Sequence, residues 1–160
     1  MTSHFKAEPF NSPLETGLRS LAILEAAFPN RYDLQRLVEL DYLVVHSADV
    51  GGPVSLHAPL PLRAGELLVR RQLIERGLLL MMSKGLIERH PAADGIEYLA
   101  GEIASPYLAS LTAPYTVQLR ERAQWLVENF AALSTDEIRG LIRRFFAHWT
   151  SEFETVKAIG

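Results

Sequence analysis

The sequence lacks cysteine, a long hydrophobic run and a secretory signal. Without cysteine, disulfides, iron–sulfur ligation, thiolate zinc sites and cysteine nucleophiles are all excluded. This fits a reducing compartment, and we expect a cytoplasmic protein. The longest apolar run, Leu78–Met82, is far shorter than the roughly 20 residues that span a bilayer. The first residues contain no apolar stretch of the kind that directs export.

The sequence also lacks a basic excess and the common catalytic motifs. The formal net charge is −3 at pH 7 over 160 residues, whereas a dedicated nucleic-acid binder is usually basic. There is no Gly-x-Ser-x-Gly elbow, no His-Glu-x-x-His and no phosphate-binding Gly-x-x-x-x-Gly-Lys-Ser/Thr loop. These absences argue against an enzyme. We therefore predict a protein with no catalytic, cofactor-binding or metal-binding residues.

One set of residues keeps a metal site open as a weaker alternative. His46 and Asp49 are three residues apart at a predicted helix end, and His57 follows in a linker. These three side chains offer nitrogen and oxygen ligands that could serve a metal-dependent enzyme. We favour the other interpretation, that His46 and Asp49 close the helix end by hydrogen bonds, because no further histidine–carboxylate pair completes a catalytic site.

What is present is a series of helix signals. Ser12-Pro13-Leu14-Glu15 is a capping box, in which the serine accepts from the amide of the glutamate and proline takes the first helical position. It predicts a helix that ends before Pro29-Asn30. Asp33 can cap a second helix, whose apolar residues keep a helical spacing as far as Val45. Residues 50–65 contain several prolines and glycines and predict an irregular linker.

A third helix is predicted from about residue 65 to residue 83, followed by a hairpin. Gly77 lies inside this helix and predicts a close contact with another helix, while Gly85 is placed as a C-cap. Two short apolar segments, at residues 86–87 and 96–99, are joined by a turn that contains Pro91 and Asp94-Gly95. An Asp-Gly pair between two such segments is a strong hairpin signal.

Further helices are predicted after the hairpin. A short helix over residues 102–111 is interrupted near Pro106, and a longer one spans roughly 114–133. Ser134-Thr135-Asp136-Glu137 is a second capping box. The last helix carries apolar residues at spacings of three and four: Ile138, Leu141, Ile142, Phe145, Phe146, Trp149 and Phe153.

These elements predict a mainly α protein with a winged helix-turn-helix core. We expect an N-terminal arm at residues 1–11, a winged-helix-like core at 12–101 with a small β-hairpin wing, and a C-terminal helical extension at 102–160. In a winged helix, the third helix and the wing face the major groove and the phosphates of DNA.

The charge pattern bears on what this core contacts. Residues 1–60 hold four basic and seven acidic groups, whereas residues 61–90 hold six basic and three acidic groups. Such a small excess would give only weak, salt-sensitive DNA binding, and the hairpin at 83–102 is acidic overall. We favour contact with a protein over contact with DNA. A third interpretation is that these basic residues form a solvated charged face without a binding role. The candidate contact residues are Arg70, Arg71, Arg76, Lys84 and Arg89.

The aromatic stripe of the last helix is a second candidate surface. Phe145, Phe146, Trp149 and Phe153 are of a kind that more often lies in a core than in an interface. A small winged helix does not need so many large apolar side chains to fill its own hydrophobic core. Part of this stripe is therefore a possible partner-binding surface.

Three stretches of the sequence resemble a known family. They are Pro9-Phe10-Asn11-Ser12-Pro13-Leu14-Glu15 with Gly17-Leu18-Arg19, DLQRLVELDYLVVHSADVGGPVSLH at residues 33–57, and RAGELLVRRQLIERGLLLMMSKGLIE at residues 63–88. Together they resemble the middle component of bacterial ABC three-component systems, of the Lamassu anti-phage type, over roughly residues 8–100. The last third is too generic to contribute.

The resemblance implies a non-catalytic winged-helix adaptor between an SMC-like ABC ATPase and an effector, commonly a nuclease. It implies that DNA is met indirectly, through the complex, and that no membrane is involved. It carries over no catalytic residues. The alternative function is a stand-alone winged-helix DNA-binding regulator that uses the third helix and the wing.

Overall fold

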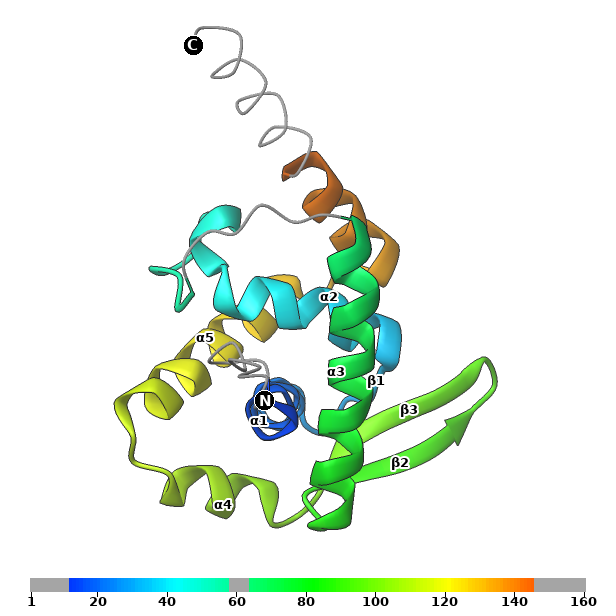
Figure 1. The fold of residues 1–160 in the computed structure, drawn as a ribbon, viewed down its shortest axis with the longest axis vertical. Coiled ribbons are helices and arrows are strands. Elements are labelled where there is room, and N and C mark those ends of the chain that lie inside the picture. The colour runs from blue at the N-terminus through cyan, green and yellow to red at the C-terminus, as the bar shows by residue number, and fades with distance from the viewer. Residues whose placement is uncertain (1–11, 58–63, 146–160) are drawn as a thin grey trace, which may run out of the picture.

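The chain is mainly helical and carries one small antiparallel sheet (Figure 1). The structure is a computed structural model that describes residues 12–57 and 64–145, without the side chains of residues 64–68. The elements are α1 (Pro13–Ala27), β1 (Tyr32–Asp33), α2 (Leu34–Val45), the 3-10 turn η1 (Ser47–Val50), α3 (Ala64–Ser83), β2 (Ile87–Ala92), β3 (Gly95–Ala100), α4 (Ala104–Ser110) and α5 (Pro114–Phe130). Residues 135–145 form a further helix. The predicted arm at residues 1–11 lies outside the described residues.

The predicted helix caps are confirmed. In each, a side-chain oxygen accepts a hydrogen bond from the amide three residues further on, which satisfies a donor that the first helical turn leaves without a partner. The pairs are Ser12 with Glu15 at 3.2 Å, Asp33 with Arg36 at 2.8 Å and Ser134 with Glu137 at 3.1 Å.

Glycine ends α3 as predicted. Gly85 has a φ of 71°, a left-handed conformation that suits glycine. The amides of Gly85 and Leu86 then donate to the carbonyls of Met82 and Met81, both at 3.0 Å. This pair of hydrogen bonds is a Schellman motif, and it turns the chain directly into the hairpin.

The predicted hairpin forms, with two differences. Residues 93 and 94 make the turn, because Ala92 pairs with Gly95. Pro91 lies inside β2, opposite Ile96, and not in the turn. An edge strand tolerates a proline because no neighbouring strand needs its missing amide, and β2 is at the edge of the order β1-β3-β2.

Strand β1 was not predicted. Tyr32 pairs with Tyr98 and Asp33 pairs with Glu97. Two residues are too few to show an alternating pattern, and their partner lies far along the chain.

Helix α4 also differs from the prediction, because it continues through Pro106 without interruption. This proline is the third residue of the helix, where an amide has no partner inside the helix in any case.

Helix α1 is the central element, seen end-on in Figure 1, and contacts α2, α3, α4 and α5. The predicted close contact at Gly77 is confirmed, since a Cβ placed there would lie 2.6 Å from the backbone nitrogen of Gly17 on α1. Two facing glycines thus let α1 and α3 approach closely.

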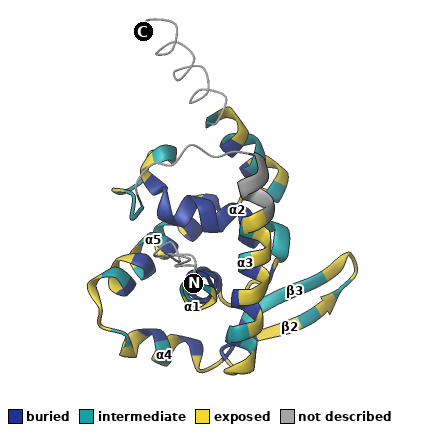
Figure 2. Cartoon of the chain, in the orientation of Figure 1, coloured by how far each residue is buried: buried dark blue, intermediate teal, exposed yellow. Residues whose placement is uncertain are grey.

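Helix α2 is buried along most of its length, from Leu37 to Val45 (Figure 2). The hydrophobic core joins residues from both sides of the predicted boundary at residue 101, for example Leu24 on α1 and Leu126 on α5. The division into a core at 12–101 and an extension at 102–160 stays a prediction. None of the helices among the described residues is long and apolar enough to cross a membrane.

Candidate functional site

A buried ion cluster joins the three helices of the core. Asp41 on α2 is fully buried, and its two oxygens are bound by two arginines. Arg19 Nε on α1 lies 2.7 Å from Oδ1, and a terminal nitrogen of Arg70 on α3 lies 2.7 Å from Oδ2. The side chains of Arg19 and Arg70 are 4% and 21% exposed. The cluster therefore contains one negative and two positive charges, largely shielded from water.

The arginines decide the ionisation of Asp41. Burial alone would raise the pKa of this carboxyl, but the charges of Arg19 and Arg70 lower it below its ordinary value. The carboxylate is thus ionised at neutral pH, and both of its oxygens accept charge-assisted hydrogen bonds. A carboxylate held in this way stabilises the packing of α1, α2 and α3 and is not placed to act as a base.

Two histidines extend the cluster toward α5. The His46 ring lies 4.6 Å from the Tyr42 ring and 6.2 Å from the His57 ring, measured between centroids. Nε2 of His57 lies 2.8 Å from the hydroxyl of Tyr115 on α5. Burial, aided by the nearby guanidinium groups, lowers the pKa of both histidines to about 4. Both rings are therefore neutral at pH 7.

The arrangement does not support the metal site considered from the sequence. Asp49 accepts a hydrogen bond from the Tyr42 hydroxyl at 3.1 Å and so binds a neighbour in the same cluster. In residues 12–57 and 64–145, no three His, Cys, Asp or Glu side chains are grouped so that they could hold a metal ion. The bond from the Tyr42 hydroxyl to Asp49 ties the segment after α2 to that helix, whereas the amide of His46 makes an ordinary helical bond to the Tyr42 carbonyl at 3.1 Å.

The five predicted basic contact residues are not equivalent. Arg70 belongs to the ion cluster, where Asp41 compensates its charge. Arg71 is 47% exposed and lies 3.7 Å from the carboxylate of Glu75. The other three, Arg76, Lys84 and Arg89, are exposed. A role of these residues in binding stays a prediction.

The outer face of α3 also carries apolar groups that the sequence analysis did not single out. Val69 and Leu79 are 56% and 61% exposed, on the side of the helix opposite the buried Ile74 and Leu78. Gln72 and Arg76 lie between them on the same face and are exposed. The available sequence signal was the presence of apolar residues outside the buried stripe of a helix.

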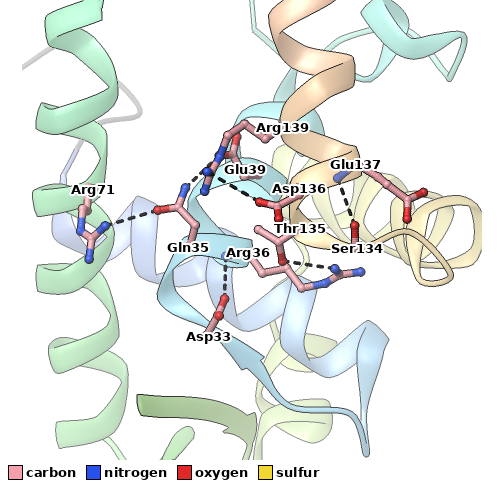
Figure 3. Close-up of polar contacts among 10 residues, drawn as sticks. All are labelled: Asp33, Gln35, Arg36, Glu39, Arg71, Ser134, Thr135, Asp136, Glu137 and Arg139. Carbon is pink, nitrogen blue, oxygen red and sulfur yellow. Dashed lines mark hydrogen bonds and ion pairs between the residues drawn. The ribbon is translucent and has the colours of Figure 1, made fainter. Parts of the chain in front are cut away.

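A polar network on the surface connects α3, α2 and the last helix (Figure 3). Arg71 donates to the Gln35 side-chain oxygen at 3.3 Å, and Gln35 donates to Glu39 at 2.8 Å. Nε of Arg139 donates to the same Glu39 oxygen at 3.1 Å. A second pair joins Arg139 to Asp136 at 3.8 Å. The network attaches the helix at 135–145 to the side of α2.

Arg36 of α2 provides a second attachment between α2 and the C-terminal helices. Its guanidinium donates to the backbone carbonyl of Phe130, the last residue of α5, at 3.3 Å and to that of Leu133 in the following turn at 2.8 Å. It also lies over the Tyr32 ring, 4.7 Å from the centroid. One side chain of α2 thus holds the turn between α5 and the last helix.

The aromatic stripe is described only at its start. Ile138 and Ile142 are 0% and 3% exposed and belong to the core, and Phe145 is half-buried. The other three aromatic residues of the stripe, Phe146, Trp149 and Phe153, lie outside the described residues. Whether the stripe binds a partner stays a prediction.

Comparison with known proteins gives one match. A family model described as Middle Component 2 (MC2) of the ABC-three component (ABC-3C) systems matches residues 9–152. The chain belongs to the MC2 family. No curated protein and no solved structure matches it.

The MC2 match confirms the resemblance to a middle component of ABC three-component systems and extends it. The three resembling stretches end near residue 100, whereas the match continues through α4, α5 and the helix at 135–145. The C-terminal helices are therefore part of the family pattern. A middle component belongs to a system of several components, so an MC2 protein has protein partners.

Proposed function

We propose that this MC2 chain is a non-catalytic adaptor subunit. It links an SMC-like ABC ATPase to an effector, commonly a nuclease, in a Lamassu-type anti-phage defence complex in the cytoplasm, and it regulates that effector. Membership of the ABC-3C middle component family supports the proposal, as do the mutual ion pairs of the buried Arg19, Asp41 and Arg70. In this proposal the chain contacts DNA only indirectly, through the complex.

A winged helix-turn-helix core is part of the proposal. The order α1-β1-α2-α3-β2-β3 and the strand order β1-β3-β2 agree with a winged helix, in which a hairpin follows the third helix. In this interpretation α3 occupies the position of the recognition helix, and β2-β3 is the wing.

The exposed face of α3 is the observation that carries the adaptor proposal. Val69 and Leu79 present apolar surface there, and the residues between them on this face are the neutral Gln72 and one arginine, Arg76. Two exposed apolar side chains with a single cation between them favour a protein partner, because phosphate contacts require a larger excess of positive charge. We propose that this face binds one partner, with Arg76 and Lys84 at its rim. We further propose that the aromatic stripe from Phe145 onward contributes to a contact.

Co-expression with the ABC ATPase of the same three-component system tests the adaptor function. The two proteins are expected to co-elute in size exclusion at micromolar concentration, and failure to do so contradicts the proposal. Val69→Asp with Leu79→Asp is expected to abolish co-elution, because each places a charge in the apolar contact. The matched control is Val54→Asp with Val117→Asp, which changes two exposed valines outside α3 (79% and 44% exposed) and is expected to leave the complex intact.

The second candidate is a stand-alone DNA-binding regulator. The exposed Arg76, Lys84 and Arg89 on α3 and the hairpin favour it. It predicts binding of duplex DNA that weakens steeply with salt and is lost when Arg71 and Arg76 are changed to Glu. An absence of binding at low salt would exclude it, while salt-dependent binding without ATPase co-elution would favour it over the adaptor.

A further inference from the structure

A groove is lined by the last turn of α1 and by α5. Helices α5 and α3 lie on different sides of α1 (Figure 1). The volume of the groove is about 450 Å³, and it is open to solvent. Glu25 lines it from the last turn of α1, and the remaining residues are on α5. The lining residues are Glu25, Arg120, Glu121, Gln124, Trp125 and Glu128.

The groove carries negative charge that the described residues leave largely uncompensated. Three carboxylates face one guanidinium, that of Arg120. Glu121 has a distant partner in Arg122, at 3.7 Å. In the described part of the chain, the half-buried Glu25 carboxylate has neither a hydrogen bond nor an ion pair. Within residues 12–57 and 64–145, Glu128 accepts a bond only from the neutral Gln124, at 2.8 Å.

Helix α1 adds to this negative potential. Its last turn contains no basic residue, and Glu25 lies at the end where the helix dipole is itself negative. A carboxylate at that place opposes helix stability, so its presence is unfavourable for the isolated chain. A cation bound in the groove would remove this cost.

Trp125 supplies a rigid aromatic surface in the same groove. The edge of its indole packs against Gly52, where a Cβ would lie only 2.4 Å from the ring. The Phe130 ring meets it at a tilt of 66°, with centroids 5.9 Å apart. The half-buried indole is thus fixed on two sides. An aromatic face beside carboxylates is a suitable environment for a guanidinium or ammonium group.

We propose that this groove binds a basic segment of a second protein partner, with an arginine or lysine side chain held between Glu25 and Glu128 and against Trp125. The proposal deepens the adaptor function and rests on it for the identity of the partner. It gives the adaptor two faces on different sides of α1, with α3 contacting one component and the groove another. The acidic character of the groove excludes a nucleic acid as its occupant.

A defined peptide probe tests the groove. The full chain with Trp149→Phe leaves Trp125 as the one tryptophan, and an acetylated peptide of alternating arginine and glycine is titrated at low salt. We expect a saturable change in Trp125 fluorescence. Glu25→Gln with Glu128→Gln is expected to weaken binding by about fivefold, as for two exposed ion pairs. The control, Glu88→Gln with Glu137→Gln, removes equal charge elsewhere and is expected to have no effect.

Three outcomes would overturn the proposal. The first is no saturable binding, and the second is an equal loss in both variants, which indicates only general attraction to an acidic chain. The third is loss of a self-associated species on Glu25→Gln with Glu128→Gln in analytical ultracentrifugation, which would identify a second copy as the occupant. The same variant is expected to co-elute with the ATPase, so a failed groove and a failed adaptor function give different results.

Discussion

Asp41 is the residue whose replacement should damage the fold most. Asp41→Asn keeps the side-chain shape but removes the carboxylate charge that compensates the buried Arg19 and the partly buried Arg70. We expect a loss of about 3–5 kcal/mol in the free energy of unfolding, because breaking a buried ion pair exposes the cost of burying the remaining charge. Urea denaturation followed by circular dichroism measures it.

An apolar replacement of the whole cluster is the control. Arg19→Met, Asp41→Leu and Arg70→Met together should be close to neutral or stabilising, since buried ion groups are often no better than well-packed apolar groups. If Asp41→Asn costs less than about 1 kcal/mol, the cluster does not stabilise the fold as proposed.

Gly77 provides a second prediction at the residue scale. Helix propensity alone predicts that Gly77→Ala stabilises α3 by about 1 kcal/mol. The added Cβ would lie 2.6 Å from the backbone nitrogen of Gly17, and a backbone cannot yield cheaply. We therefore expect a loss of about 2 kcal/mol in the free energy of unfolding.

Gly140→Ala is the matched control in another helix. A Cβ at Gly140 meets no atom within 4 Å, so the ordinary gain of about 0.5–1 kcal/mol is expected there. Thermal denaturation of both variants should show shifts of opposite sign. A stabilised Gly77→Ala variant would contradict the close approach of α1 and α3.

At the scale of elements, Arg36 fastens the last helix to α2. Arg36→Met removes the donor that serves the carbonyls of Phe130 and Leu133. We expect faster amide hydrogen exchange over residues 131–145 and a loss of about 2 kcal/mol in stability. Arg31→Met, which changes an exposed arginine before β1, should alter neither. Uniform exchange throughout the chain would show instead that the last helix unfolds only with the core.

At the scale of the whole molecule, stability should fall on acidification. The pKa of His46 and His57 is about 4 in the folded chain, against about 6.5 in an unfolded one. Between these values the unfolded chain binds more protons, so the free energy of unfolding decreases as the pH falls. We expect a loss of about 2 kcal/mol from pH 7 to about pH 4.5, because both rings are only partly shielded from solvent.

Urea denaturation at the two pH values measures this change. His57→Gln keeps a polar group opposite Tyr115 but cannot titrate, so it should reduce the pH dependence markedly. Stability that is independent of pH in the unmodified chain would contradict the burial of the two neutral rings.

Much of the secondary structure could be predicted from the sequence, because its causes are local. Ser12, Asp33 and Ser134 each cap a helix through an amide three residues away, and Gly85 ends α3 through residues of the same turn. The hairpin likewise follows from its own turn and apolar segments. Even the close helix contact was predictable at Gly77, since a glycine inside a helix costs stability unless something approaches closely.

The candidate sites could not be predicted in this way, because their contacts join residues that are far apart in the sequence. Asp41 meets arginines 22 and 29 residues away, and Arg36 meets a carbonyl 97 residues away. Arg70 was expected on a contact surface because its charge is visible in the sequence and its partner is not. Strand β1 was missed for the same reason, since two residues form a strand only when β3 lies beside them.

The sequence by itself determined where the helices begin and end, where the hairpin turns and to which family the chain belongs, because caps, turns and motifs act within a few residues. Tertiary structure alone decided which charges are buried together, which face of α3 stays exposed and that Glu25 and Trp125 line one groove. Those outcomes depend on how α1 packs between α3 and α5, and such packing is set by many weak contacts between distant residues.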